Sequence, residues 1–198
     1  MKLKALAVVP AAVLALALTA GCSSDSDDAS ASASTAGDGT SSQPCEPVAA
    51  DASPTWKLDG TAGSVTVAVT DDAANKAPSV DLTTPFSVDE TAVHTLVKGD
   101  GDVVCEDSTA DVLYEGVNGR DSRVFDSSYA NGTPVPFPVS TVVAGFQKAL
   151  IGQTVGSTVA VAMPPADGYG PSGGSPDAGI EPDDSLVFVL KITGTTGS

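Results

Sequence analysis

Val124-Phe125-Asp126-Ser127-Ser128 is the stretch of this sequence that decides the fold. Two later stretches complete its pattern: Asp167-Gly168-Tyr169-Gly170 and Ser185-Leu186-Val187-Phe188. Taken singly, their phenylalanines would be core residues in any mixed α and β domain, so the order and spacing of the set carry the information. The 198-residue chain has one histidine, no clustered metal ligands and no evident nucleophile beside a base. This inventory suits a reaction without acid or base catalysis, and it predicts no metal and no cofactor.

Apolar residues around these stretches mostly alternate with period two. Four segments show the alternation: Val65–Val69, Val112–Tyr114, Val159–Met163 and Leu186–Ile192. Such alternation is typical of an antiparallel sheet with one buried face. Residues 142–150 instead have helical spacing, with Ser140 or Thr141 as N-cap and Gly152 as C-cap. The sequence predicts an α+β fold in which one short helix lies on a twisted antiparallel sheet.

From Val93 to Thr193, the motifs resemble those of FKBP-type peptidyl-prolyl cis-trans isomerases. Besides the three stretches above, Gly145-Phe146 and Met163-Pro164-Pro165 fit the family's helix and following strand. The resemblance implies a sheet that half-wraps the helix, with an apolar active-site cleft between them. It also implies catalysis of X-Pro bond rotation, whose barrier of about 18–20 kcal/mol comes from lost amide resonance. A site that removes water from the amide and binds its twisted form better lowers this barrier without proton transfer.

The resemblance places the family's site on named positions of this chain. Six residues correspond to catalytic positions: Tyr114, Phe125, Asp126, Phe146, Tyr169 and Phe188. Five others correspond to substrate-binding positions: Val135, Phe137, Val142, Val143 and Ile180. The Tyr169 hydroxyl and the Val143 N–H correspond to donors to the bound carbonyl. The implied partners are proline-containing polypeptides as substrates and macrolides such as tacrolimus as inhibitors.

Three residues depart from the family's pattern. Val135 replaces an aromatic residue, Asn131 stands where a basic partner for the aspartate often lies, and Glu181 replaces an apolar residue beside Ile180. They leave a second hypothesis open, namely an FKBP-like module that binds or chaperones proline-containing chains without catalysis. Peptide binding without faster cis–trans exchange would identify that alternative. The favoured prediction is an isomerase that assists the folding of exported proteins.

The N-terminus determines the predicted compartment. Residues 1–21 have two lysines and then an apolar run, which is the layout of a secretory signal peptide. Leu18-Thr19-Ala20-Gly21-Cys22 resembles a bacterial lipobox, with Thr19 in place of the usual leucine. The resemblance implies acylation of Cys22 and an extracytoplasmic protein that is lipid-anchored to the bacterial cell membrane. The alternative is an ordinary secreted protein with Cys22 as an odd thiol.

Composition divides the remaining chain into three predicted parts. Residues 22–44 form a disordered tether rich in Ser, Asp and Ala, residues 45–91 an N-terminal extension packed on the sheet, and residues 92–198 the isomerase domain. Cys45 and Cys105 are the remaining cysteines, and an oxidising compartment favours a disulfide between them over two buried thiols. The formal net charge of −16 argues against nucleic-acid binding. A monomer is expected.

Overall fold

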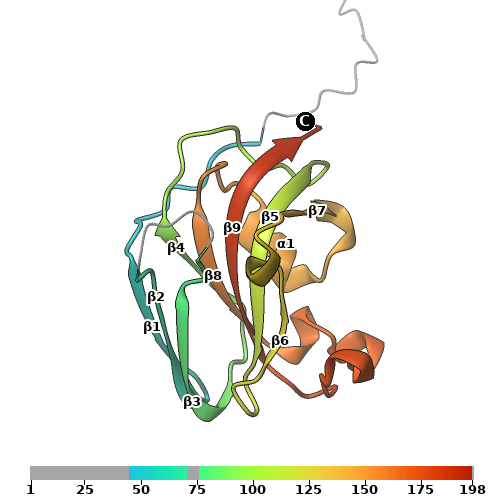
Figure 1. Cartoon of the computed structure of the whole chain (residues 1–198). Helices are drawn as coiled ribbons and strands as arrows, with labels where there is room; N and C mark the ends of the chain where they lie inside the picture. Colours follow the sequence, from blue (N-terminus) through green and yellow to red (C-terminus); the bar gives the residue numbers. More distant parts are fainter. Residues whose placement is uncertain (1–44, 71–75, 198) are drawn as a thin grey trace, which may run out of the picture. The chain divides into compact units, whose positions relative to one another are not determined.

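Two antiparallel sheets and one α-helix make up the part of the chain that the structure describes, residues 45–70 and 76–197 of a computed structural model (Figure 1). All of these residues belong to one compact unit. The predicted signal peptide, the lipidation site at Cys22 and the predicted tether lie outside the described residues. The predicted α+β class, an antiparallel sheet with one short helix, is confirmed.

The large sheet contains the strands that were predicted to carry the site. Its order is β4-β8-β9-β5-β6, and β7 also pairs with β5. The strands are β4 (Ala92–Val97), β5 (Thr109–Asn118), β6 (Val124–Ser127), β7 (Val135–Pro138), β8 (Thr158–Met163) and β9 (Leu186–Thr196). The long pairing of β5 with β9 sets Gly116 opposite Phe188 and Tyr114 opposite Leu190. The chain's last strand therefore lies at the centre of the sheet.

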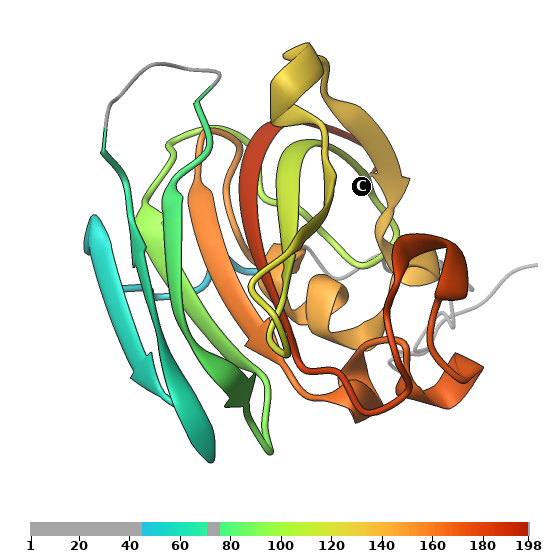
Figure 2. The same ribbon diagram turned by 60° about the horizontal axis from the view of Figure 1, so that its bottom comes forward.

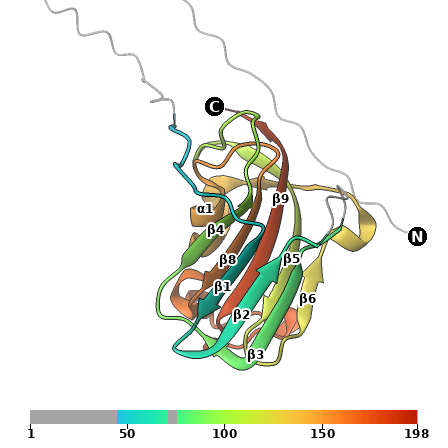
Figure 3. The same ribbon diagram turned by 90° about the vertical axis from the view of Figure 1, so that its left-hand side faces the viewer.

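The N-terminal extension forms a sheet of its own. This small sheet has the order β1-β2-β3, with strands β1 (Thr55–Asp59), β2 (Ala62–Ala68) and β3 (Ser79–Ser87). It lies across one face of the large sheet, and the helix lies on the other face (Figures 2 and 3). The fold therefore has three layers in the order small sheet, large sheet, helix.

Alternate residues of the central strands enter two different cores. Val159 and Val161 of β8 belong to the core beneath the helix, whereas Ala160 and Ala162 belong to the core beneath the small sheet. Every residue of β8 is buried. The single buried face that alternation predicted is therefore wrong for this strand, because the N-terminal extension, which was expected to pack on the sheet, covers the other face.

The helix α1 (Ala144–Leu150) is shorter than its apolar spacing suggested. Val142 and Val143 have extended backbone conformations, as suits β-branched side chains, and Val143 is the N-cap without a side-chain capping bond. The predicted N-cap candidates lie earlier, in the 3-10 helix η2 (Val139–Thr141). Phe146, Ala149 and Leu150 are buried, and Gly152 follows with the left-handed φ of 79° expected of a C-terminal glycine.

The segment before β1, and β1 itself, are fastened to other parts of the unit by a disulfide, a backbone hydrogen bond and a stacked pair of rings. Cys45 and Cys105 form a disulfide, with their Cα atoms 5.6 Å apart. The Val48 N–H donates to the Gly152 carbonyl at 2.8 Å, and Trp56 stacks on His94 with ring centroids 5.8 Å apart. No helix within the described ranges has the length and apolar character to cross a bilayer.

If the small sheet is part of the cooperative core, truncating its buried face will destabilise the whole unit. Val67 in β2 is fully buried, and Val93 in β4 is 38% exposed. We expect Val67→Ala to lower the free energy of unfolding by about 2 kcal/mol, through two lost methyl groups and the cavity they leave. Val93→Ala is the matched control and should cost no more than about 0.5 kcal/mol. Denaturant unfolding measures both, and equal effects would contradict a shared core.

Candidate active site

Five aromatic side chains from five different elements form a continuous cluster between the large sheet and α1. They are Tyr114 in β5, Phe125 in β6, Phe137 in β7, Phe146 in α1 and Phe188 in β9. The ring centroids are 5.5 Å apart for Tyr114–Phe137, 5.2 Å for Phe137–Phe146, 5.4 Å for Phe146–Phe188 and 5.5 Å for Phe125–Phe188. Three of these four contacts are edge-to-face, the arrangement that the quadrupoles of aromatic rings favour. The cluster joins residues spread over more than seventy positions of sequence.

The cluster has a buried floor and a partly accessible rim. Phe146 and Phe188 are only 5% and 4% exposed, whereas Tyr114, Phe125 and Phe137 are half-buried. Other predicted residues complete the apolar surface: Val142, Val143 and Tyr169, which are half-buried, and Ile180, which is buried. This arrangement offers an apolar surface with a rigid base to a ligand from outside.

Val135 is the one apolar residue among the predicted site residues that lies outside this cluster. It is half-buried in β7, opposite Val112 of β5, two residues before Phe137. Alternation along the strand sends both side chains to the same face. Only Phe137 packs against the cluster.

Asp126 receives a hydrogen bond from the Tyr114 hydroxyl at 2.6 Å. Burial and this interaction with the carboxylate raise the pKa of Tyr114 above its ordinary value. A phenol that donates to an ionised carboxylate makes a short, strong hydrogen bond. Tyr114 is thus a hydrogen-bond partner of Asp126. The basic residue that often partners the aspartate in the family is replaced by Asn131 in this chain.

Tyr169 lies in the turn between the 3-10 helices η3 (Pro165–Asp167) and η4 (Gly170–Ser172). Burial, and then the negative charge of Asp126, raise the pKa of its phenol, so the hydroxyl remains a donor. Within residues 45–70 and 76–197, neither this hydroxyl nor the Val143 N–H donates to a protein acceptor. Both predicted donors therefore remain available to a bound carbonyl.

The residue two places before Tyr169 fixes the start of its turn. The Asp167 carboxylate accepts hydrogen bonds from Thr91 and from the Lys148 ammonium group, whose Nζ lies 2.6 Å from Oδ2. These two bonds, the one from Lys148 first, lower the pKa of Asp167. The turn is thereby tied both to α1 and to the segment that joins the small sheet to β4.

Sequence reasoning missed a polar network at the edge of the site. Asn118 and Arg120, at the turn after β5, contact the buried Asp184 just before β9. The only available signal was compositional, because both arginines of this acidic chain lie between positions 118 and 124. Glu181 is the charged residue that follows Ile180. Its Oε1 lies 3.6 Å from Arg120 Nη1, so the two side chains form an ion pair.

Comparisons with known proteins agree with this site. Residues 101–193 match the family of FKBP-type peptidyl-prolyl cis-trans isomerases. The chain is 30% identical over 117 residues to an FK506-binding protein of Streptomyces anulatus, which covers 58% of this chain and 94% of that protein. It is 28% identical over 116 residues to a probable FK506-binding protein of Corynebacterium glutamicum, with 58% and 95% covered. It is also 35% identical over 99 residues to the peptidyl-prolyl cis-trans isomerase Mip of Coxiella burnetii, with 49% and 41% covered.

The fold and the site thus define an α+β protein with a half-exposed aromatic surface between the large sheet and α1, and the Tyr114–Asp126 pair and Tyr169 lie at the rim of this surface. Among the described side chains, no group of three His, Cys, Asp or Glu residues is placed to hold a metal ion. The chain belongs to the FKBP-type peptidyl-prolyl cis-trans isomerase family, as the resemblance predicted.

The three tyrosines lead to a prediction about alkaline pH. The pKa of each phenol is raised, primarily by burial. A group with a raised folded pKa contributes stability that is complete below its unfolded pKa of about 10 and is lost as the pH rises toward the folded value. We expect less phenolate absorbance at 295 nm at pH 10.5 in the folded protein than in the unfolded chain, and at higher pH we expect the phenols to ionise together with unfolding. The protein in concentrated guanidinium chloride is the control, and a folded-state titration near pH 10 would contradict the raised values.

Proposed function

We propose that this chain is a lipid-anchored, extracytoplasmic prolyl isomerase that assists the folding of exported proteins at the outer face of the cytoplasmic membrane. The main support for isomerase activity is that a half-exposed aromatic cluster lies against two hydrogen-bond donors without a protein acceptor, the Tyr169 hydroxyl and the Val143 N–H. The lipobox-like start of the sequence supports the location.

Such a site suits a reaction that breaks no bond. Water stabilises the planar, polar amide through hydrogen bonds to its oxygen, and an aromatic surface displaces that water. The twisted amide is less polar and therefore loses less hydration free energy when it moves from water to the aromatic surface. The site thus binds the transition state better than the ground state. The Tyr169 hydroxyl would hold the carbonyl that precedes the rotating bond. A millionfold acceleration requires about 8 kcal/mol from these effects together.

FK506 and related macrolides are proposed ligands of the same surface. Two relatives of this chain are named as FK506-binding proteins, and the aromatic floor formed by Phe146 and Phe188 supplies the rigid apolar base that such a ligand needs. The Arg120–Glu181 ion pair supports this proposal, because it gives the Glu181 carboxylate a partner away from the apolar surface.

Removing one hydroxyl from the site should reduce catalysis, and removing another far from it should not. Tyr169 lines the aromatic cluster, whereas Tyr129 is buried in the core beneath the small sheet. We expect Tyr169→Phe to lower kcat/KM on an X-Pro peptide by about tenfold, because one preorganised donor is lost, and Tyr129→Phe to leave it unchanged. Two-dimensional NMR exchange on the peptide measures both. Peptide binding by the wild type without faster exchange would instead identify a non-catalytic binding module.

The anchoring proposal depends on one side chain. We expect the full-length wild-type protein, expressed in a bacterium that processes lipoproteins, to partition into the detergent phase on Triton X-114 extraction. Cys22→Ser should move it to the aqueous phase, because the thiol that receives the lipid is gone. Ser24→Ala serves as the matched control and should remain in the detergent phase. Wild-type protein in the aqueous phase would contradict lipidation.

A further inference from the structure

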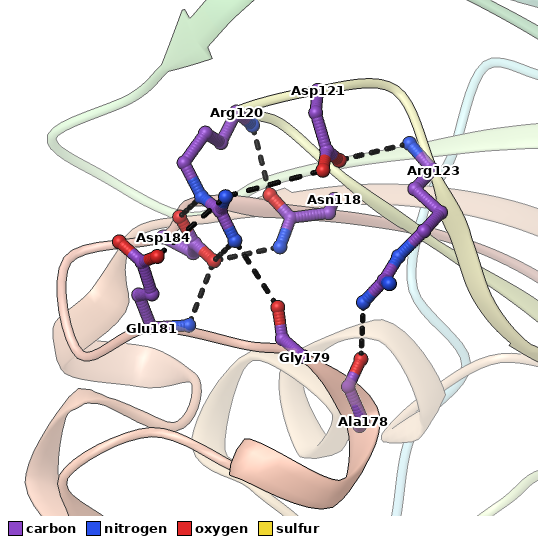
Figure 4. A network of polar contacts seen from close by, with 8 residues as sticks. All are labelled: Asn118, Arg120, Asp121, Arg123, Ala178, Gly179, Glu181 and Asp184. Carbon is purple, nitrogen blue, oxygen red and sulfur yellow. Dashed lines mark hydrogen bonds and ion pairs between the residues drawn. The ribbon is translucent and has the colours of Figure 1, made fainter.

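The turn between β5 and β6 is fastened to the loop that precedes β9 (Figure 4). Arg123 Nη2 donates to the Ala178 carbonyl at 2.9 Å, and Arg120 Nη2 donates to the Gly179 carbonyl at 3.1 Å. These are the chain's two arginines, and both of them hold the same loop. The turn and the loop are about sixty residues apart in sequence, so the contact is a feature of the tertiary fold.

Asp184 is the centre of this network. Its carboxylate accepts four hydrogen bonds: from Asn118 Nδ2 at 2.6 Å, Arg120 Nε at 2.9 Å, Arg120 Nη2 at 3.3 Å and the Glu181 N–H at 2.8 Å. The residue is only 6% exposed, and a buried carboxylate is costly unless it is paired and hydrogen-bonded. Burial raises the pKa of Asp184, but the bonds from Arg120, Asn118 and the Glu181 N–H more than offset this and lower it. The group is therefore an ionised acceptor with all of its neighbours engaged.

The hydrogen bond to the Glu181 N–H connects Asp184 to the apolar surface of the site. Ile180, the residue before Glu181, is 3% exposed and packs in the aromatic cluster with Phe188. Ile180 also exchanges two backbone hydrogen bonds with Ser175, at 2.8 and 2.9 Å, which close the loop on itself. Fixing the peptide group between Ile180 and Glu181 thus fixes the side chain that completes one wall of the cluster.

The N-terminal extension also makes hydrogen bonds to the turn that contains Arg120 and to the residue after Asp184. The Phe86 N–H donates to the Gly119 carbonyl at 2.8 Å, and the Gly119 N–H donates to the Ser185 carbonyl at 2.9 Å. The Val88 N–H donates to Ser185 Oγ at 3.3 Å. The turn at Arg120 and the residue after Asp184 are therefore both held in place by the end of β3 and by Val88, which follows it. The backbone on both sides of the Asp184 network is thus fixed by hydrogen bonds.

We propose that Asp184 is a positioning residue for the isomerase site, which holds Ile180 against the aromatic cluster by gathering Asn118, Arg120 and the Glu181 N–H around one buried carboxylate. The proposal rests on the isomerase function proposed above. Asp184 is only 6% exposed and its hydrogen bonds go to Asn118, Arg120 and the Glu181 N–H, so we expect it to act on the site through Ile180 and not by contact with a substrate. We expect the effect to fall mainly on substrate binding, because the Ile180 side chain would contact the bound peptide in both the ground state and the transition state.

The first experiment compares Asp184→Asn with Asp183→Asn, a matched change at the adjacent exposed residue. Rates on an X-Pro peptide are measured well below the melting temperature of each variant. We expect Asp184→Asn to raise KM about tenfold with kcat within about twofold of wild type, and Asp183→Asn to change neither. A purely structural role would lower only the concentration of active enzyme and hence the apparent kcat, leaving KM unchanged. That result, or equal behaviour of the two variants, would overturn the proposal.

A double-mutant cycle tests whether the effect passes through Ile180. In an Ile180→Ala background, Asp184→Asn should raise KM no more than about twofold further, because the positioned side chain is already gone. A full tenfold effect in that background would overturn the proposed route. Wild-type protein that does not accelerate exchange would instead overturn the isomerase function. The positioning role is then tested by the Kd of the same peptide, which should rise about tenfold in Asp184→Asn, and an unchanged Kd would overturn it.

Discussion

Burial of both faces of the central strands is the constraint on which the rest of this structure depends. β8 and the first half of β9 send alternate residues into two cores, and every residue of β8 and of the stretch 186–190 in β9 is buried. On the helix side, large residues such as Met163 and Phe188 fill the space beneath α1, whereas Ala160 and Ala162 on the other side let the small sheet approach closely. Because hydrophobic stabilisation scales with the apolar area removed from water, neither layer is dispensable to the other.

The site uses this rigidity in a specific way. Phe146 and Phe188 belong to the core and to the site at once, so the floor that a ligand would meet cannot shift without disturbing core packing. The rim is different, because it consists of half-buried side chains on β5, β6, β7 and two loops. Hydrogen bonds replace packing there: Tyr114 is held by Asp126, and the Tyr169 turn is held through Asp167. Preorganisation of this kind lowers the free-energy cost of ordering the protein when a ligand binds.

Much of this architecture could be predicted from the sequence because its determinants are periodic or local. Alternation in Val159–Met163 and Leu186–Ile192 predicted strands, and the spacing of Phe125, Phe146 and Tyr169 indicated the family. The second buried face could not be predicted in this way. Alternation shows that one face of a strand is apolar, but small residues such as Ala160 on the opposite face are equally compatible with solvent and with a close-packed layer. The helix start was placed too early because apolar spacing does not distinguish an extended Val142-Val143 pair from a first helical turn.

The Asp184 network escaped sequence reasoning for a more general reason. From sequence alone, a carboxylate is expected at the protein surface. Burial of Asp184 becomes favourable only through Asn118 and Arg120, which lie about sixty positions away and which no local sequence pattern connects with it. The placement nonetheless follows from a physical requirement. An isomerase site that works by excluding water must keep charge away from its apolar surface, which is difficult in a chain with a net charge of −16. Engaging Asp126 with a phenol, and Asp184 and Glu181 with Arg120, keeps carboxylates near the site while directing their charge into hydrogen bonds and ion pairs. The polar network at the edge of the site is thus a condition for the apolar character of its centre.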